Sequence, residues 1–386
     1  MPPSSIEATS SVLATQRSRW LSGFLLSLRE NSPMLLLVLV FWFAADTLSA
    51  SLGTPYRALD QWLDSYVGYI ATCFACFSVA FILWILHTTL KRNISIQTKD
   101  FWRRIVTEFA SRERILLAFP ILALWPVMAL SFSLVKALIP ASMPYYLDPL
   151  LHAADHAILL GHDPWAVLQP LFGHPLVTYV IDRLYALWLF VMYFALLLQI
   201  TSTKDRVLRT RFLFSSMLAW ILLGSLAATL LSSVGPCYYG AIVGQPDPYA
   251  PLMSYLHDTV EHNPITIFGF SFTPELIALR VQDLLWGYYQ QGDVGLGRGI
   301  SAAPSLHVAS TWLIARMLQT YGRRGAIFGW GFFSIILLGS VHLGWHYLSD
   351  GLISIAGAWM LWHAVGWWLT RPAVQRLLWP NGLSRA

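Results

Sequence analysis

Two histidines and an aspartate in the last third of the chain have the types and spacing needed for phosphoryl transfer. His346 and Asp350 are four residues apart, so on a helix they share one face. A carboxylate there can accept a hydrogen bond from one imidazole nitrogen and leave the other free to attack. His307 offers a second imidazole for general acid catalysis. Ser301 and Ser305 flank a predicted helix start, where hydroxyl and backbone N–H groups favour an anion. This set suggests phosphoryl transfer without a metal.

The elements that position these residues are predicted to be membrane-spanning helices. The chain has 386 residues, of which 56% are hydrophobic and 12% charged, and this composition excludes water-soluble and disordered classes. A bilayer crossing needs about 20 mostly apolar residues. The stretches that qualify are 33–52, 66–90, 115–140, 175–200, 212–236, 304–320, 325–343 and 349–370. We therefore predict an all-α polytopic membrane protein with about eight transmembrane helices.

The distribution of basic residues predicts the orientation. With the N-terminus in the cytoplasm, nineteen of the 25 Lys and Arg residues fall on the cytoplasmic side, which agrees with the positive-inside rule. We expect a multi-pass cell membrane protein with both termini cytoplasmic, and the net charge of +5 then reflects its loops rather than a nucleic-acid partner. Residues 299–310 and 339–351 would share the extracytoplasmic face. Two long outer segments, 141–174 and 237–303, are expected to be partly helical.

Two of these stretches resemble a known family. Residues 304–307, Pro-Ser-Leu-His, resemble the second signature of the type 2 phosphatidic acid phosphatase superfamily, usually Pro-Ser-Gly-His, and residues 339–350 resemble its third. Leu306 in place of glycine is closer to the inositolphosphotransferase-like branch, which includes inositol phosphorylceramide synthases. Residues 235–239 and 182–185 also resemble that branch.

The resemblance implies a fold, a division of the chain and a mechanism. A six-helix phosphatase/phosphotransferase core would occupy 115–370. It would follow a tail, two extra transmembrane helices and a basic cytoplasmic loop in 1–114, and precede a cytoplasmic tail in 371–386. His346 would attack phosphorus, Asp350 would orient it and His307 would protonate the leaving alkoxide. The resemblance thus implies a metal-independent lipid phosphotransferase without cofactors, or a lipid phosphate phosphatase that uses the same phosphohistidine. Its partners would be a lipid or lipid-linked phosphate and the bilayer.

Two departures from the family concern phosphate binding. The first signature is absent, and Ser340 stands where the third has an arginine. Because phosphoryl transfer needs positive charge at the phosphate oxygens, other cations must replace these residues. We expect Arg298 first and Arg183 second. The further candidates are Arg280 and Lys136.

The aromatic residues expected to form walls of the site are Tyr238, Tyr239 and Trp286.

Two alternatives stay open, and the first is a metal-dependent enzyme. His342 and His346 are four residues apart, as are His152 and His156 with Asp155 between them, and either pair could bind zinc or iron. No HExxH sequence is present.

A transporter is the other alternative. It would need acidic residues at mid-membrane or repeated halves. Asp46 and Asp182 are the only acids well inside the predicted spans, and no repeat is visible.

Overall fold

The protein is described by a computed structural model of residues 5–53, 59–108, 111–262, 265–267, 270–272, 274–292, 297–380 and 382. Within these residues, the regular secondary structure is helical apart from one antiparallel pair of three-residue strands, β1 (Ile265–Ile267) and β2 (Phe270–Phe272). The side chains of residues 5–19, 59–62, 64, 65, 265–267 and 270–272 lie outside the description.

Seven helical segments of the described chain are long and apolar enough to cross a membrane. They are Trp20–Ser51 in α1 (Ser5–Ser51), Tyr66–Lys91 in α2 (Leu59–Leu86) with η1 (His87–Lys91), α4 (Arg112–Ala137), α8 (Pro175–Ala186) with α9 (Trp188–Ile200), α10 (Arg206–Leu218) with η2 (Ala219–Ala227) and α11 (Ala228–Leu230), α16 (Arg323–His342) and α17 (Leu348–Leu369). The prediction of an all-α polytopic membrane protein is confirmed.

The predicted span at 304–320 differs from the structure. It is α15 (Leu306–Gln319), a helix of 14 residues, which is roughly 21 Å long by its rise per residue and too short to cross a hydrocarbon core of about 30 Å. Its side chains are mostly buried, and it packs against α16, α17, α10 and α9. The apolar run therefore reflects a position inside the bundle, because a helix that is hydrophobic all round is buried.

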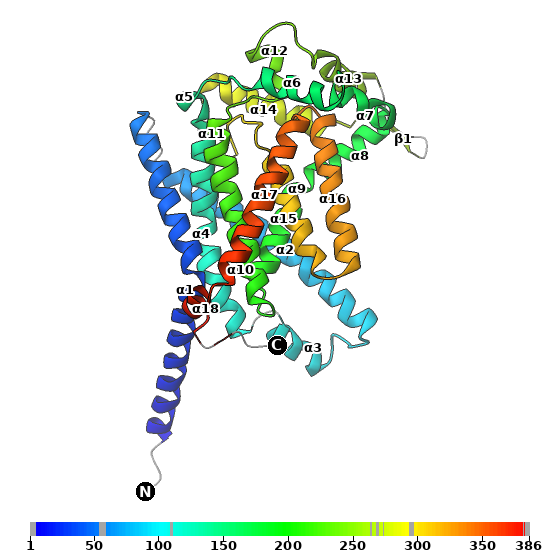
Figure 1. The fold of residues 1–386 in the computed structure, drawn as a ribbon. Coiled ribbons are helices and arrows are strands. Elements are labelled where there is room, and N and C mark those ends of the chain that lie inside the picture. The colour runs from blue at the N-terminus through cyan, green and yellow to red at the C-terminus, as the bar shows by residue number, and fades with distance from the viewer. Residues whose placement is uncertain are drawn as a thin grey trace.

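The two long segments between spans form a cap over one end of the bundle (Figure 1). As predicted, both are partly helical. The cap elements are α5 (Ile139–Ser142), α6 (Asp148–Ile158), α7 (Pro164–Phe172), η3 (Pro236–Tyr238), α12 (Tyr239–Ile242), α13 (Ala250–His262), the β1–β2 pair and α14 (Ile277–Gln291). The turn between α16 and α17, which contains His346, lies directly beneath this cap.

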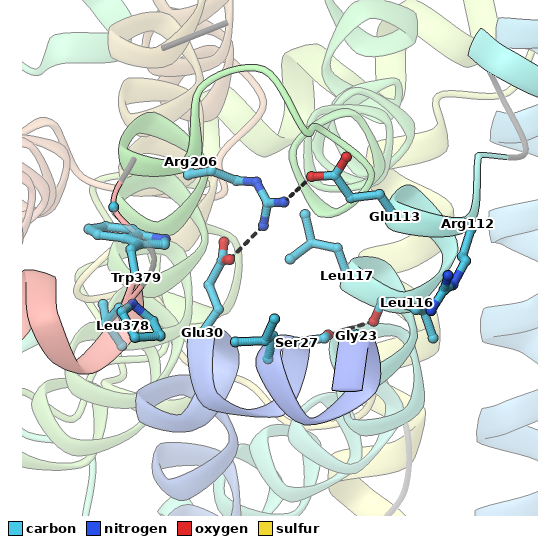
Figure 2. A pocket seen from close by; sticks show the side chains of 13 residues that line it. Gly23, Ser27, Glu30, Arg112, Glu113, Leu116, Leu117, Arg206, Leu378 and Trp379 are labelled. Atoms are coloured by element: carbon cyan, nitrogen blue, oxygen red, sulfur yellow. Dashed lines mark hydrogen bonds and ion pairs between the residues drawn. The ribbon is translucent and has the colours of Figure 1, made fainter. Parts of the chain in front are cut away.

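Polar side chains join the helices at the other end, toward α3 (Lys99–Glu108) and α18 (Pro372–Leu378). Figure 2 shows Arg206 of α10 between Glu30 of α1 and Glu113 of α4, beside a cavity of about 530 Å³. Arg209, one turn along α10, is fully buried and donates to Asn31 Oδ1 at 3.0 Å. Since a buried guanidinium must be paired, these contacts fix α1 against α10.

Candidate active site

His307, His346 and Asp350 meet beneath the cap. The Nδ1 atom of His346 lies 3.3 Å from Asp350 Oδ2, and its Nε2 atom lies 3.3 Å from His307 Nδ1. His346 is 5% exposed and Asp350 is fully buried. The rings of Tyr185 and Trp188 lie against His307, with centroids 5.0 and 4.1 Å from it. Residues 43 positions apart in the sequence therefore form one compact group.

The turn 343–347 directs His346 back into the bundle. The N–H groups of Trp345 and His346 both donate to the Ser340 carbonyl in the last turn of α16. Gly344 has φ +72°, a conformation that glycine adopts without steric cost. Asp350 then accepts from the N–H of Tyr347 at 3.1 Å, which caps α17 and fixes the carboxylate beside the ring.

The hydrogen bonds determine which nitrogen of His346 can react. An ionised carboxylate can only accept, so with Asp350 ionised the proton of His346 would be on Nδ1, facing Asp350. The Nε2 atom then has a lone pair, and it faces His307. Such an arrangement can supply an oriented nucleophile next to a second imidazole that can carry a proton.

Ser305 and Ser301 occupy different places at the start of α15. Ser305 is buried, and its hydroxyl accepts from the Val308 N–H at 3.4 Å as the helix N-cap. Ser301 lines the cavity beside the two histidines, whereas Ser305 is not part of the cavity wall. Of the two predicted serines, only Ser301 can meet a ligand there without rearrangement.

A cavity of about 490 Å³ opens beside His307 and His346. Two cations, Lys136 of α4 and Arg298, line it, and the Arg298 guanidinium lies 4.4 Å from the centre of the Tyr288 ring. Most other wall residues are apolar or aromatic, and they come from α4, α8, α9, η2 and α14; among them are Phe132, Trp188, Leu189, Tyr193, Trp220 and Leu285. The cavity wall thus combines two cations with a mostly apolar lining.

Of the other predicted site residues, Tyr238 lies in the wall of this cavity, whereas Tyr239 and Arg183 do not. Tyr238 lines the cavity and stacks on Trp286, with ring centroids 5.6 Å apart. Tyr239 lies outside that wall, in a cluster with Tyr249 and Tyr347. Arg183 also lies outside it, because its guanidinium pairs with Asp182 at 2.8 Å and donates to the Glu275 carbonyl.

The two further cations predicted from the sequence lie in different places. Arg280 is largely exposed and lies 3.9 Å from Glu275, away from the cavity. Lys136, one of the further candidates, lines the cavity.

Buried aspartates of the cap hold the backbone around the site, and sequence reasoning did not find this role. Asp148 accepts from the N–H groups of Val234 and Gly235 and from the Tyr347 hydroxyl. Asp155 accepts from the N–H groups of Leu348 and Ser349 at the start of α17. Burial raises the pKa of the Asp155 carboxyl group, and these donors oppose that rise. The only sequence signal was acidic residues in an otherwise apolar outer segment.

The two histidine pairs have separate environments. His342 is fully buried, and its Nε2 lies 2.9 Å from the Thr178 hydroxyl, so it does not share the cavity with His346. His152 and His156 lie on α6 with Asp163, whose Oδ1 is 2.8 Å from His156 Nε2. Burial lowers the pKa of His152, and the Asp163 carboxylate partly opposes this.

Comparison with known proteins gives one match. Neither the curated proteins nor the solved structures contain one that matches the chain. The family model of the PAP2 superfamily matches residues 149–367, more than half of the chain, and this range contains both histidines, Asp350 and most of the cap. The chain therefore belongs to the PAP2 superfamily.

Proposed function

We propose that the protein is a lipid phosphotransferase that transfers a phosphoryl or phospho-headgroup from a lipid donor to an alcohol acceptor. Membership of the PAP2 superfamily suggests an enzyme of the lipid phosphatase or phosphotransferase type with a lipid-phosphate substrate. The observation that carries the finer proposal is the position of His346 at the wall of a largely apolar cavity. A lipid tail fits such a cavity, and its apolar walls disfavour water as the acceptor.

The proposed reaction has two steps, both at His346 Nε2. In the first, Nε2 forms a bond to phosphorus, the bond from phosphorus to the donor oxygen breaks, and protonated His307 gives its proton to the leaving alkoxide. In the second, the acceptor hydroxyl attacks phosphorus, the P–N bond breaks, and His307 takes the hydroxyl proton. Asp350 holds the His346 ring and stabilises the charge that it gains.

Phosphate binding is assigned to Arg298, Lys136 and Ser301. These side chains line the same cavity as the two histidines. The positive charge of Arg298 and Lys136 would compensate the charge on the phosphoryl oxygens that the arginines of the absent signatures normally balance, and the Ser301 hydroxyl would donate a hydrogen bond. Arg183 is a weaker candidate, since it is paired with Asp182 outside the cavity wall.

Within the superfamily, we assign the chain to the inositolphosphotransferase-like branch. Leu306 replaces the glycine of the usual signature, and residues 182–185 and 235–239 resemble that branch. Tyr185 and Tyr238 from these two stretches both line the cavity, which supports a role for them in the site.

The proposal also includes the orientation and the division of the chain. Both termini would be cytoplasmic and the cap extracytoplasmic, since the basic residues concentrate at the end opposite the cap. The core at 115–370 would carry out the reaction, and 1–114 would be an addition to it.

The test uses purified full-length protein in EDTA with labelled phospholipids and lipid phosphates, each with and without ceramide, diacylglycerol or inositol. Thin-layer separation resolves free phosphate from a transferred product. We expect a new phosphodiester that forms only with an alcohol acceptor and is absent in His346→Ala. Free phosphate that no acceptor changes would instead establish a phosphatase.

Three further measurements address the assigned roles. Trapped ³²P on the wild type and none on His346→Ala would support the covalent step. Turnover lost in EDTA at a temperature where the protein stays folded, and restored by a divalent metal, would contradict the metal-independent scheme. Arg298→Ala should raise KM for the lipid phosphate, and an unchanged KM and kcat would remove Arg298 from the site.

A further inference from the structure

Three side chains of the cap form a cluster with metal-binding chemistry away from the catalytic histidines. His152 and His156 lie one turn apart on α6, and Asp163 is the residue directly before α7. One possible ligand atom from each lies within 4.8 Å of the other two. None of the three lines the cavity beside His346. The cluster is therefore a separate feature.

The distances suit a small dication. Tetrahedral zinc with bonds of 2.0–2.1 Å places its ligand atoms roughly 3.3 Å apart. Asp163 Oδ1 lies 2.8 Å from His156 Nε2 and 3.5 Å from His152 Nδ1, so both separations are within about half an ångström of that value. Imidazole nitrogen with one carboxylate oxygen is a donor set that zinc accepts.

The cluster is also accessible. The side chains of His152, His156 and Asp163 are 22%, 37% and 20% exposed. A cavity of about 300 Å³ opens beside His152, between Tyr239 and residues 243–248. A hydrated cation can thus enter from the outer surface and keep a water molecule as its fourth ligand.

We propose that His152, His156 and Asp163 bind one Zn²⁺ ion that fixes the outer cap. The ion joins α6 to the start of α7 across the turn 159–162. Because α6 also contains Asp148 and Asp155, which hold the loop 233–235 and the start of α17, binding stabilises the scaffold around His346. The role is structural, and it does not depend on the proposed reaction.

The experiment uses full-length protein without a histidine tag, stripped with EDTA and then titrated with Zn²⁺. We expect one equivalent per chain and a Tm that rises with Zn²⁺ concentration, because a ligand that binds only the folded state stabilises it. Co²⁺ in place of Zn²⁺ should give the d–d absorption of a tetrahedral site.

The variants are His156→Ala and Asp163→Asn, with His162→Ala as the matched control. Asn retains the size of Asp163, and the Asp163 side chain makes no capping hydrogen bond to α7, so this variant removes only the negative charge of the ligand. We expect both variants to weaken Zn²⁺ binding by more than about 10-fold and to lose the Tm rise. His162 is exposed in the same turn, and its removal should leave binding unchanged. Equal Zn²⁺ affinity in the wild type and both variants, or no stoichiometric binding, would overturn the proposal.

Discussion

The Asp350 carboxylate contacts its neighbours through one oxygen. Oδ2 accepts from both the His346 ring and the Tyr347 N–H, whereas Oδ1 is buried without a hydrogen-bond partner among the described residues. One atom therefore fixes the ring of His346 and the backbone next to it. This makes the charge of Asp350, rather than its size, the property to test.

Asp350→Asn should lower kcat by about 100-fold or more, since an amide can donate to Nδ1 and so place the imidazole proton on Nε2. Steady-state kinetics in detergent would measure it. His342→Gln is the control: this buried histidine contacts Thr178 outside the cavity, so its loss should lower Tm while kcat stays within a few-fold. A near-normal kcat in Asp350→Asn would contradict the orienting role.

Gly235 marks a close approach of three chain segments. Its φ is +92°, and an added Cβ would lie 2.8 Å from the Trp345 carbonyl oxygen and 3.1 Å from Ala302 Cβ. Gly235→Ala should thus displace the turn that carries His346, destabilise the fold by about 1–3 kcal/mol and reduce turnover. Gly292→Ala is the matched control, because Gly292 also has a positive φ but an added Cβ there would have no atom within 4 Å. Similar losses in the two variants would show that backbone strain alone matters.

At the scale of elements, buried aspartates hold helix starts. Asp155 accepts two N–H groups at the start of α17, and Asp182 accepts those of Ile277 and Ala278 at the start of α14. A helix N-terminus attracts a carboxylate through its unpaired N–H groups and its dipole. These contacts join cap helices to helices of the bundle, so they transmit the geometry of the cap to the site.

Asp155→Ala should lower stability by about 1–2 kcal/mol and also reduce kcat, because the start of α17 adjoins His346. The control is Asp205→Ala at the other end of the bundle, where Asp205 accepts from the Leu208 N–H as the N-cap of α10. We expect a similar loss of Tm there with kcat retained. Equal kcat in the two variants would limit Asp155 to a stabilising role.

Sequence reasoning predicted the helices better than the loops between them. Hydropathy is a local property, so the spanning helices could be predicted, but it did not distinguish α15, whose apolar run is buried by neighbouring helices. His346 and Asp350 are in contact, but they do not share one helical face as predicted, because His346 lies in the turn before α17. The cavity wall could not be predicted, because it depends on how α4, α9 and η2 pack. Lys136 lies in that wall, whereas Arg183 and Tyr239 do not.

At the scale of the whole molecule, the N-terminal helix is joined to the family core through buried charges. Arg209 lies in the matched range and is fully buried; it contacts Asn31 and lies 3.7 Å from Glu30 of α1. Helix α1 is therefore not independent of the matched range, since it supplies partners for a guanidinium in that range.

Arg209→Ala should destabilise the protein by about 3–5 kcal/mol, because it leaves Asn31 Oδ1 and the Leu117 carbonyl buried without their donor and removes one of the two guanidinium groups near Glu30. Thermal unfolding in detergent would measure the effect. Arg103→Ala removes an exposed pair with Asp100 and should leave Tm nearly unchanged, because solvent screens such a pair. The double variant Arg209→Met with Glu30→Gln should recover part of the loss, and equal Tm in Arg209→Ala and wild type would contradict the assignment.

The length of α15 has a consequence for depth in the bilayer. The helix α15 has 14 residues, whereas α16, its antiparallel neighbour across the turn 320–322, has 20. The start of α15 therefore lies roughly 9 Å below the cap end of α16. With the cap end of α16 at the headgroup layer, a lipid phosphate would have to leave that layer to reach His307. Turnover in vesicles should therefore fall as longer acyl chains thicken the bilayer, while a water-soluble phosphoester should be converted at a rate that thickness does not change.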